Sequence, residues 1–321
     1  MKLDTEFIKL PLTFDVERMR SEVEAIPESD WRPHPQGHPG NSALPLIALN
    51  GNPTDDGVAG TMLPTPHLER CEYLRQVLAS FETVFGRSRL MRLEGKSEAT
   101  LHVDTNYYWA DRVRIHVPIT TSPVIEFICN ERSVHMAAGE AWIFDAWRLH
   151  NVLNPTGDRR VHLVGDTVGS AAFWSLVERG EWPFADDGRQ PAEPRHVAHQ
   201  PGAQVELETE RSNYPLVMDP WEQQLLSQSL LDDLPENGAR EANEAFTEAI
   251  HRFHQDWRVA WARYGRAEEG WPAYDRLRQG LDQAIAPYEG KIKLAENNTD
   301  AVEIARQMLI RPALNPQLAG R

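Results

Sequence analysis

Residues 134–154 read VHMAAGEAWIFDAWRLHNVLN, and this stretch decides the fold that the sequence predicts. A turn at Gly139-Glu140 leads into the apolar run 141–144, and a second short extended run begins at His150. Similar short runs, separated by turn residues, predict strands at 88–93, 99–104, 113–120, 124–130, 133–136, 140–144, 150–154 and 161–168. Short, evenly spaced strands are typical of a mainly β fold, a double-stranded β-helix of the jelly-roll or cupin type.

Helical periodicity flanks this barrel on both sides. Residues 15–26, capped by Asp15, predict a short helix, and residues 66–85 predict a single helix that packs on the sheet. Four segments near the end of the chain, 221–234, 239–264, 273–288 and 299–310, predict a helical C-terminal domain. The predicted organisation is a barrel domain with flanking helices at 1–180, a polar linker at 181–220, and the helical domain at 221–321.

The composition restricts the partners. The formal charge of -15 argues against nucleic acid, because phosphate binding needs a basic surface. No apolar run approaches the ~20 residues of a membrane helix, and the first residues lack the pattern of a signal peptide, so we expect a cytoplasmic protein without a membrane partner. Cys71 and Cys129 are too few for a disulfide framework, and we expect both to be buried thiols.

Three residues have the pattern of a metal site. His102 and Asp104 are two apart, so on an extended strand both side chains leave the same face, and His150 follows the strand 140–144. Two imidazoles and one carboxylate leave half of an octahedral metal open, as non-haem Fe(II) oxygenases require. Taken alone, His102 and Asp104 fit a polar pair on a solvent face better than a metal site, and it is the addition of His150 and Arg160 in register that favours the metal site. Asp145 is a less suitable ligand, because an Asp at a strand end more simply caps the following turn.

Arginines gather in the middle third of the chain, and this local positive charge favours an anionic co-substrate. They are Arg112, Arg114, Arg148, Arg159 and Arg160. Residues 160–164 alternate polar with apolar, so Arg160 and His162 face one way while Val161 and Leu163 face the other. A planar guanidinium such as that of Arg160 can hold a carboxylate through two parallel hydrogen bonds.

Together these motifs resemble the aspartyl/asparaginyl beta-hydroxylase superfamily of Fe(II)- and 2-oxoglutarate-dependent oxygenases over residues 91–169. The segment 136–150 is especially similar to that of bacterial proline 3-hydroxylases. The residues that carry the resemblance are His102-Val103-Asp104, Arg114-Ile115-His116-Val117, the strand 138–145, His150 and Arg160.

The resemblance implies a role for each of these side chains. His102, Asp104 and His150 would hold Fe(II), and Arg160 would pair with the distal carboxylate of 2-oxoglutarate. Arg114 and His116 would place the other end of 2-oxoglutarate or the substrate carboxylate, although Arg114 fits a cross-strand ion pair nearly as well. With O2, the reaction would hydroxylate a C–H bond of an amino acid, or of an amino-acid residue in a small peptide, and release succinate and CO2.

The remaining expectations concern substrate and partners. The polar and aromatic loop after the ligand pair supplies the substrate candidates Asn106, Tyr108, Trp109 and Arg112. Trp142, Phe144 and Val152 suit either an apolar pocket lining or barrel core. Tryptophans in the tail indicate helix-to-barrel packing or a homodimer. Two alternatives stay open: a metal-dependent cupin enzyme that does not use 2-oxoglutarate, and a non-catalytic barrel that binds a ligand or partner.

Overall fold

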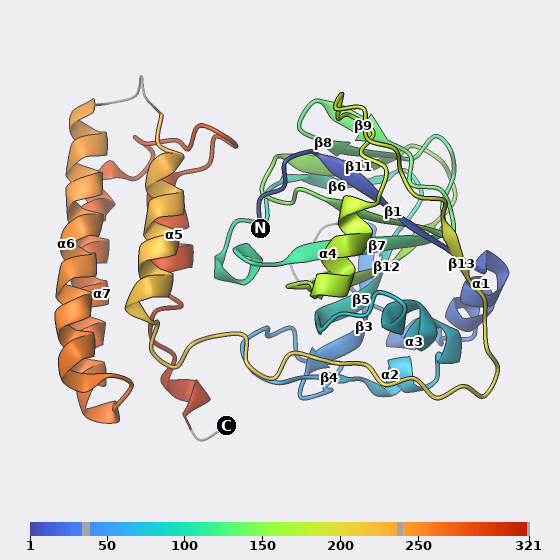
Figure 1. Ribbon diagram of the computed structural model, residues 1–321, viewed down its shortest axis with the longest axis horizontal. Coiled ribbons are helices and arrows are strands. Elements are labelled where there is room, and N and C mark those ends of the chain that lie inside the picture. The colour runs from blue at the N-terminus through green and yellow to red at the C-terminus, as the bar shows by residue number, and fades with distance from the viewer. Residues whose placement is uncertain (34–38, 236–239, 320–321) are drawn as a thin grey trace. The chain divides into compact units, whose positions relative to one another are not determined.

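A computed structural model describes residues 1–33, 39–235 and 240–319. The chain divides into two compact units, one made of residues 1–104 and 111–211 and the other of residues 105–110 and 212–321. The first unit is mainly β and the second is helical (Figure 1), which confirms the predicted fold class. The predicted domain bounds, 1–180 and 221–321, remain a prediction, and residues 181–211 of the expected linker lie in the β unit.

Two sheets build the β unit. The large sheet has the strand order β13-β1-β10-β7-β12-β5-β3-β2, with β4 also paired to β3, and the small sheet has the order β6-β11-β8-β9. The strands of the large sheet are β1 (Phe7–Phe14), β2 (Arg32–Pro33), β3 (Asn41–Leu49), β4 (Met62–Pro64), β5 (Phe85–Leu93), β7 (Val113–Thr120), β10 (Glu140–Phe144), β12 (Arg160–Thr167) and β13 (Arg195–Val197). Those of the small sheet are β6 (Ser97–His102), β8 (Glu126–Cys129), β9 (Arg132–Val134) and β11 (His150–Asn154).

The large sheet has two different faces because side chains alternate along each strand. Its outer face contributes Leu90, Ile115 and Leu163 to a core that is covered by helices α1 (Val16–Glu24), α2 (Pro66–Glu69), α3 (Glu72–Ala79) and α4 (Ala171–Glu178). Its inner face packs on the small sheet, where the Phe127 ring lies 4.7 Å from that of Phe144 and 5.7 Å from that of Phe7. This sheet-on-sheet packing is that of the predicted double-stranded β-helix.

One helix differs from its prediction. Residues 66–85 do not form a single helix, because α2 ends after one turn and Cys71 leaves helical geometry with φ -107° and ψ 83°. Leu68 and Leu74 are both fully buried, so the break lets each short helix bury its own apolar side. The chain then turns at Glu82, whose φ is +52°, and strand β5 begins at Phe85.

The helical unit contains α5 (Pro220–Asp232), α6 (Arg240–Tyr264), α7 (Trp271–Ile285) and α8 (Ala301–Ala305), the last followed by a π turn, η5 (Arg306–Ile310). Its core is centred on Trp257, which is fully buried, lies 4.5 Å from the Tyr274 ring and donates its indole N–H to the Met218 carbonyl. Short 3-10 turns complete the structure at η1 (Glu28–Asp30), η2 (Tyr107–Trp109), η3 (Glu268–Gly270), η4 (Ala286–Tyr288) and η6 (Pro316–Leu318).

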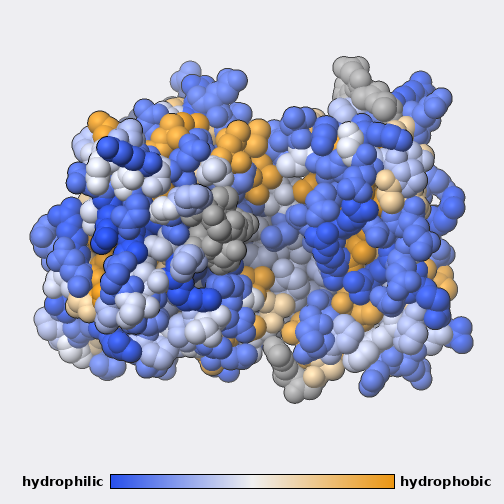
Figure 2. Space-filling view, turned by 180° about the vertical axis from the view of Figure 1, so that it is seen from behind, coloured by the Kyte–Doolittle hydropathy of each residue, from blue (hydrophilic) through white to orange (hydrophobic). Residues whose placement is uncertain are grey.

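The surface agrees with the acidic composition. The face drawn in Figure 2 is mainly hydrophilic, and its apolar residues lie in separate patches. Within the described parts of the chain, no helix combines the length and apolar character needed to cross a bilayer. Cys71 and Cys129 are free and buried, as predicted, and burial raises the pKa of both thiols to about 12.

Candidate metal centre

Strand pairing brings the predicted ligands together. His102 ends β6 and His150 begins β11, and the two residues are direct partners across these antiparallel strands, with ring centroids 4.2 Å apart. Asp104 lies two residues beyond the end of β6, where its backbone N–H donates to the Ala146 carbonyl at 2.9 Å. One donor atom from each of the three side chains lies within 4.8 Å of the others, and among the described residues no other trio of potential ligands does so.

Local hydrogen bonds orient both imidazoles. The Nδ1 of His102 lies 2.6 Å from the Thr100 carbonyl, and the Nδ1 of His150 lies 2.9 Å from the Arg148 carbonyl. A carbonyl only accepts, so each Nδ1 carries the proton and each Nε2 keeps a lone pair for a metal. Burial lowers the pKa of His150 to about 4, which keeps this ring neutral at physiological pH.

Asp104 completes the donor set with an ionised oxygen. Burial opposes ionisation, but positive charge, first that of Arg114, outweighs it and lowers the pKa of Asp104. Its Oδ2 is buried without a hydrogen bond and lies 3.7 Å from the Arg114 Nη1. One carboxylate oxygen and two imidazole lone pairs are the donors of a two-histidine, one-carboxylate metal site, so these residues fit a divalent cation such as Fe(II).

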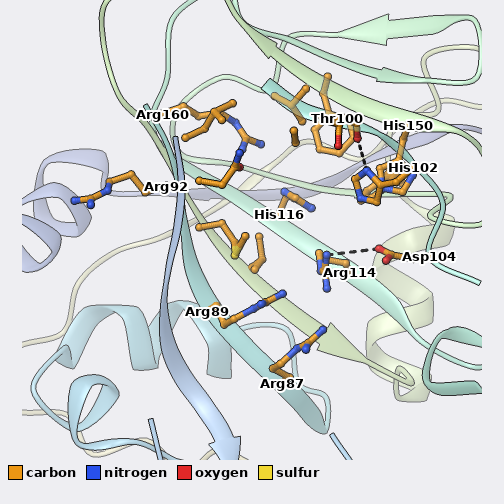
Figure 3. Close-up of a pocket in the computed structure, with 18 residues that line it drawn as sticks. Arg87, Arg89, Arg92, Thr100, His102, Asp104, Arg114, His116, His150 and Arg160 are labelled. Atoms are coloured by element: carbon orange, nitrogen blue, oxygen red, sulfur yellow. Dashed lines mark hydrogen bonds and ion pairs between the residues drawn. The ribbon is translucent and has the colours of Figure 1, made fainter. Parts of the chain in front are cut away.

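The three side chains open onto a cavity of about 170 Å³ inside the β unit (Figure 3). Phe127, Phe144 and Val152 form part of its apolar wall. Trp142, which is also an expected lining residue, is not among the lining residues, and its indole N–H donates to Glu140 at 2.8 Å. The cavity therefore combines three potential metal ligands with an apolar wall.

Arg160 reaches the same cavity from β12. Its Cζ lies 6.0 Å from the centroid of the Phe127 ring, and that ring stacks on His150 at 6.4 Å. Its Nη2 lies 2.9 Å from the Nδ1 of His162, and no carboxylate of the described chain forms an ion pair with it. Burial lowers the pKa of Arg160 to about 9, so the side chain remains a cation at neutral pH.

Arg114 and His116 line the cavity from β7. Arg114 is the direct cross-strand partner of Asp166, and its Nε donates to the Asp166 carboxylate at 2.8 Å, so the cross-strand ion pair that was expected as one alternative is present. The His116 ring is buried, and burial followed by the charge of Arg160 lowers its pKa well below the usual value. The Nε2 of His116 has no hydrogen-bond partner in the described residues.

The predicted substrate residues lie elsewhere. Asn106, Tyr108 and Trp109 belong to the helical unit, where Tyr108 and Trp109 are buried. Arg112 is buried in the β unit, and its Nε donates to Glu210 at 2.7 Å, which favours a structural role. None of the four lines the cavity, and their part in substrate binding remains a prediction.

Two arginines of the cavity, Arg87 and Arg89, were not among the predicted site residues. The signal was present, since Arg87, Arg89, Met91 and Leu93 alternate along β5 and all four line the cavity. Asp145, in contrast, is a cap as expected, because its carboxylate accepts from the Trp147 N–H at 3.0 Å and from the Leu3 N–H at 3.1 Å.

Comparison with known proteins agrees with the sequence motifs. L-proline cis-3-hydroxylase 1 from a Streptomyces species is 27% identical over 141 residues, which cover 40% of this chain and 48% of that protein. The match thus spans about half of the relative's length.

Two solved structures are similar at a lower level. A 2OG-Fe(II) oxygenase family oxidoreductase from Burkholderia pseudomallei is 14% identical, with a TM-score of 0.34, over 49% of this chain and 80% of that one. HygX from Streptomyces hygroscopicus, solved with nickel and 2-oxoglutarate, is 15% identical, with a TM-score of 0.35, over 52% of this chain and 84% of that one. These TM-scores are too low to support an argument.

The family description aspartyl/asparaginyl beta-hydroxylase matches residues 58–169, a segment that contains His102, Asp104, His150 and Arg160. This match agrees with the resemblance that the motifs carry: residues 58–169 are similar to aspartyl/asparaginyl beta-hydroxylases.

Proposed function

We propose that this chain is an Fe(II)- and 2-oxoglutarate-dependent dioxygenase that hydroxylates an unactivated C–H bond of an amino acid, or of an amino-acid residue in a small peptide. The observation that carries the proposal is the meeting of two Nε2 lone pairs, one ionised carboxylate and one buried guanidinium in a single cavity. The similarity to a proline cis-3-hydroxylase supports an amino-acid substrate.

Each side chain has a defined part in this mechanism. His102, Asp104 and His150 would hold the iron on one side and leave its other side open. Arg160 would bind the distal carboxylate of 2-oxoglutarate through paired N–H donors, and its hydrogen bond to His162 fixes one of its nitrogens. When bound, iron, 2-oxoglutarate and O2 together supply the oxidising power for C–H hydroxylation, with succinate and CO2 as by-products.

The rest of the cavity would protect the reaction and position the substrate. Phe127, Phe144 and Val152 exclude water and offer no easily oxidised polar group close to the ligands. His116 stays neutral and adds a further uncharged polar ring to the cavity wall. The chain's own contribution is therefore to orient the bound molecules and to exclude water, while the metal would perform the difficult chemistry.

The test is anaerobic binding of Fe(II) and 2-oxoglutarate, followed by succinate release in air with free amino acids and short peptides. We expect the visible charge-transfer band of a 2-oxoglutarate–Fe(II) chelate, and succinate release that a substrate stimulates. A metal-dependent cupin enzyme that does not use 2-oxoglutarate would bind iron without the band. A chain that binds neither iron nor 2-oxoglutarate would contradict the proposal and favour a non-catalytic barrel.

A further inference from the structure

Five arginines line the cavity, and most have partners that account for their charge: Arg87, Arg89, Arg92, Arg114 and Arg160. Arg92 is held by Glu28 through hydrogen bonds of 2.8 and 2.6 Å and stacks on the Trp31 ring at 4.4 Å. In Figure 3 its side chain points away from the other labelled residues. Asp166 pairs with Arg114 and also lies 3.8 Å from the Arg87 Nε.

Arg89 is different. It is only 5% exposed, and in the described chain no hydrogen bond or ion pair is made by its guanidinium. Burial and then the neighbouring charge of Arg87 push its pKa well below the usual value. A buried cation without a partner is strongly unfavourable, so a protein keeps one where an anion binds.

Strand alternation places Arg89 on the cavity side of β5, together with Arg87, Met91 and Leu93. On one side Arg89 pairs with Val164 of β12, and on the other it pairs with Pro45 of β3. Arg89 therefore occupies a cavity position that the fold itself sets.

Arg89 and Arg160 enter the cavity from separate positions along the sheet. Arg160 and Val164 are four residues apart on β12, which corresponds to about 13 Å of strand, and Arg89 lies level with Val164. His116 is also level with Val164, and Figure 3 shows Arg160 and Arg89 on different sides of His116. Asp104 lies within electrostatic reach of Arg89. A 2-oxoglutarate molecule that extends from Arg160 to the metal ligands thus leaves Arg89 beside the metal without an anion.

We propose that Arg89, with Arg87 beside it, is a second anion site that binds a carboxylate of the substrate. The inference rests on the proposed function, which assigns Arg160 to 2-oxoglutarate. It narrows the substrate class to molecules that bring a free carboxylate next to the metal, such as a free amino acid or a residue with a terminal or acidic carboxylate. A residue inside a neutral peptide lacks that group.

The test uses Arg89→Met, with Arg92→Met as the matched control from the same strand and Arg160→Met as the co-substrate variant. Each protein is loaded with Mn(II) and 2-oxoglutarate, and its Tm is followed with sodium acetate as the probe. Acetamide serves as the neutral isostere, and sodium chloride matches the ionic strength. Calorimetry gives the Kd for 2-oxoglutarate.

In the wild type and in Arg92→Met we expect a saturable rise in Tm of roughly 3–6 °C at an acetate concentration ten times its Kd, and no rise with acetamide. Arg89→Met should lose this rise, keep its Kd for 2-oxoglutarate within about threefold, and melt no lower than the wild type without acetate, because an unpaired cation has been removed.

Three results would overturn the assignment: an acetate response that persists in Arg89→Met or is absent from the wild type, a fall in the Tm of acetate-free Arg89→Met, or a loss of 2-oxoglutarate affinity as large as that in Arg160→Met. The last result would move Arg89 into the co-substrate site and leave the proposed function intact. A wild-type protein that does not bind 2-oxoglutarate would contradict the proposed function itself, and this result is distinct from the three above.

Discussion

Replacing Arg160 with Met should stabilise the ligand-free protein while it removes the proposed co-substrate site. Burial lowers the pKa of Arg160 from 12.5 to about 9. At 1.36 kcal/mol for each pKa unit, this corresponds to roughly 5 kcal/mol of unfavourable free energy for keeping the cation in the empty cavity. Met fills a similar volume without charge, and after the lost hydrogen bond to His162 we expect a net gain of about 1–3 kcal/mol in the free energy of unfolding.

The same substitution removes the donors that we propose for the distal carboxylate of 2-oxoglutarate, so we expect the Kd for 2-oxoglutarate to rise by roughly 100-fold. Urea unfolding of the metal-free protein and calorimetry of the Mn(II)-loaded protein measure the two effects. Arg92→Met is the control, because Arg92 is already neutralised by Glu28 and should keep its 2-oxoglutarate affinity. A variant that is less stable than the wild type, or that binds 2-oxoglutarate as tightly, would refute the reasoning.

The other predictions concern the metal, the pH response and the helical unit. His150→Ala should abolish stoichiometric Co(II) binding, measured by calorimetry, whereas His135→Ala should leave it unchanged; equal binding by both variants contradicts the site. The metal-free protein should lose stability as the pH falls below about 6.5, because histidine rings that stay neutral when buried become protonated in the unfolded chain. At pH 5.5 the loss is about 1.4 kcal/mol for each ring that stays neutral, and flat urea-unfolding data between pH 7.5 and 5.5 would argue against it. The rings concerned have lowered pKa values: His116, His150 and His162. In the helical unit, Trp257→Ala should cost about 3–5 kcal/mol of stability and Trp221→Ala less than ~0.5 kcal/mol, because the first side chain is fully buried and the second is 75% exposed; similar denaturation midpoints would disprove this.

Much of the fold could be predicted because local signals agree with it. The strands at 113–120, 140–144 and 150–154 have the predicted bounds, since turn residues flank each apolar run. The break between α2 and α3 could not be predicted, because the helical spacing of Leu68 and Leu74 continues through it. Only the packing of two short helices on the sheet interrupts that pattern.

The candidate site shows a similar division. The grouping of His102, Asp104 and His150 follows from spacing along the chain and from strand order. Alternation along β5 places Arg89 on the cavity side, but the sequence does not show whether an arginine has an acidic partner. Arg92 is held by Glu28, which comes from 64 residues earlier in the chain, so only the folded structure shows which arginine is neutralised.

The location of these arginines also bears on how fast an anion can enter. The chain as a whole carries a formal charge of -15, yet five arginines are among the residues that line its cavity. A dianion that diffuses towards the protein is first repelled by the outer surface and is attracted only within a few ångströms of the opening. Added salt screens the distant repulsion more than the attraction at close range, because the Debye length is about 10 Å at 0.1 M. Entry of 2-oxoglutarate should therefore become faster with moderate ionic strength, the opposite of the behaviour of an enzyme that steers its anion from afar.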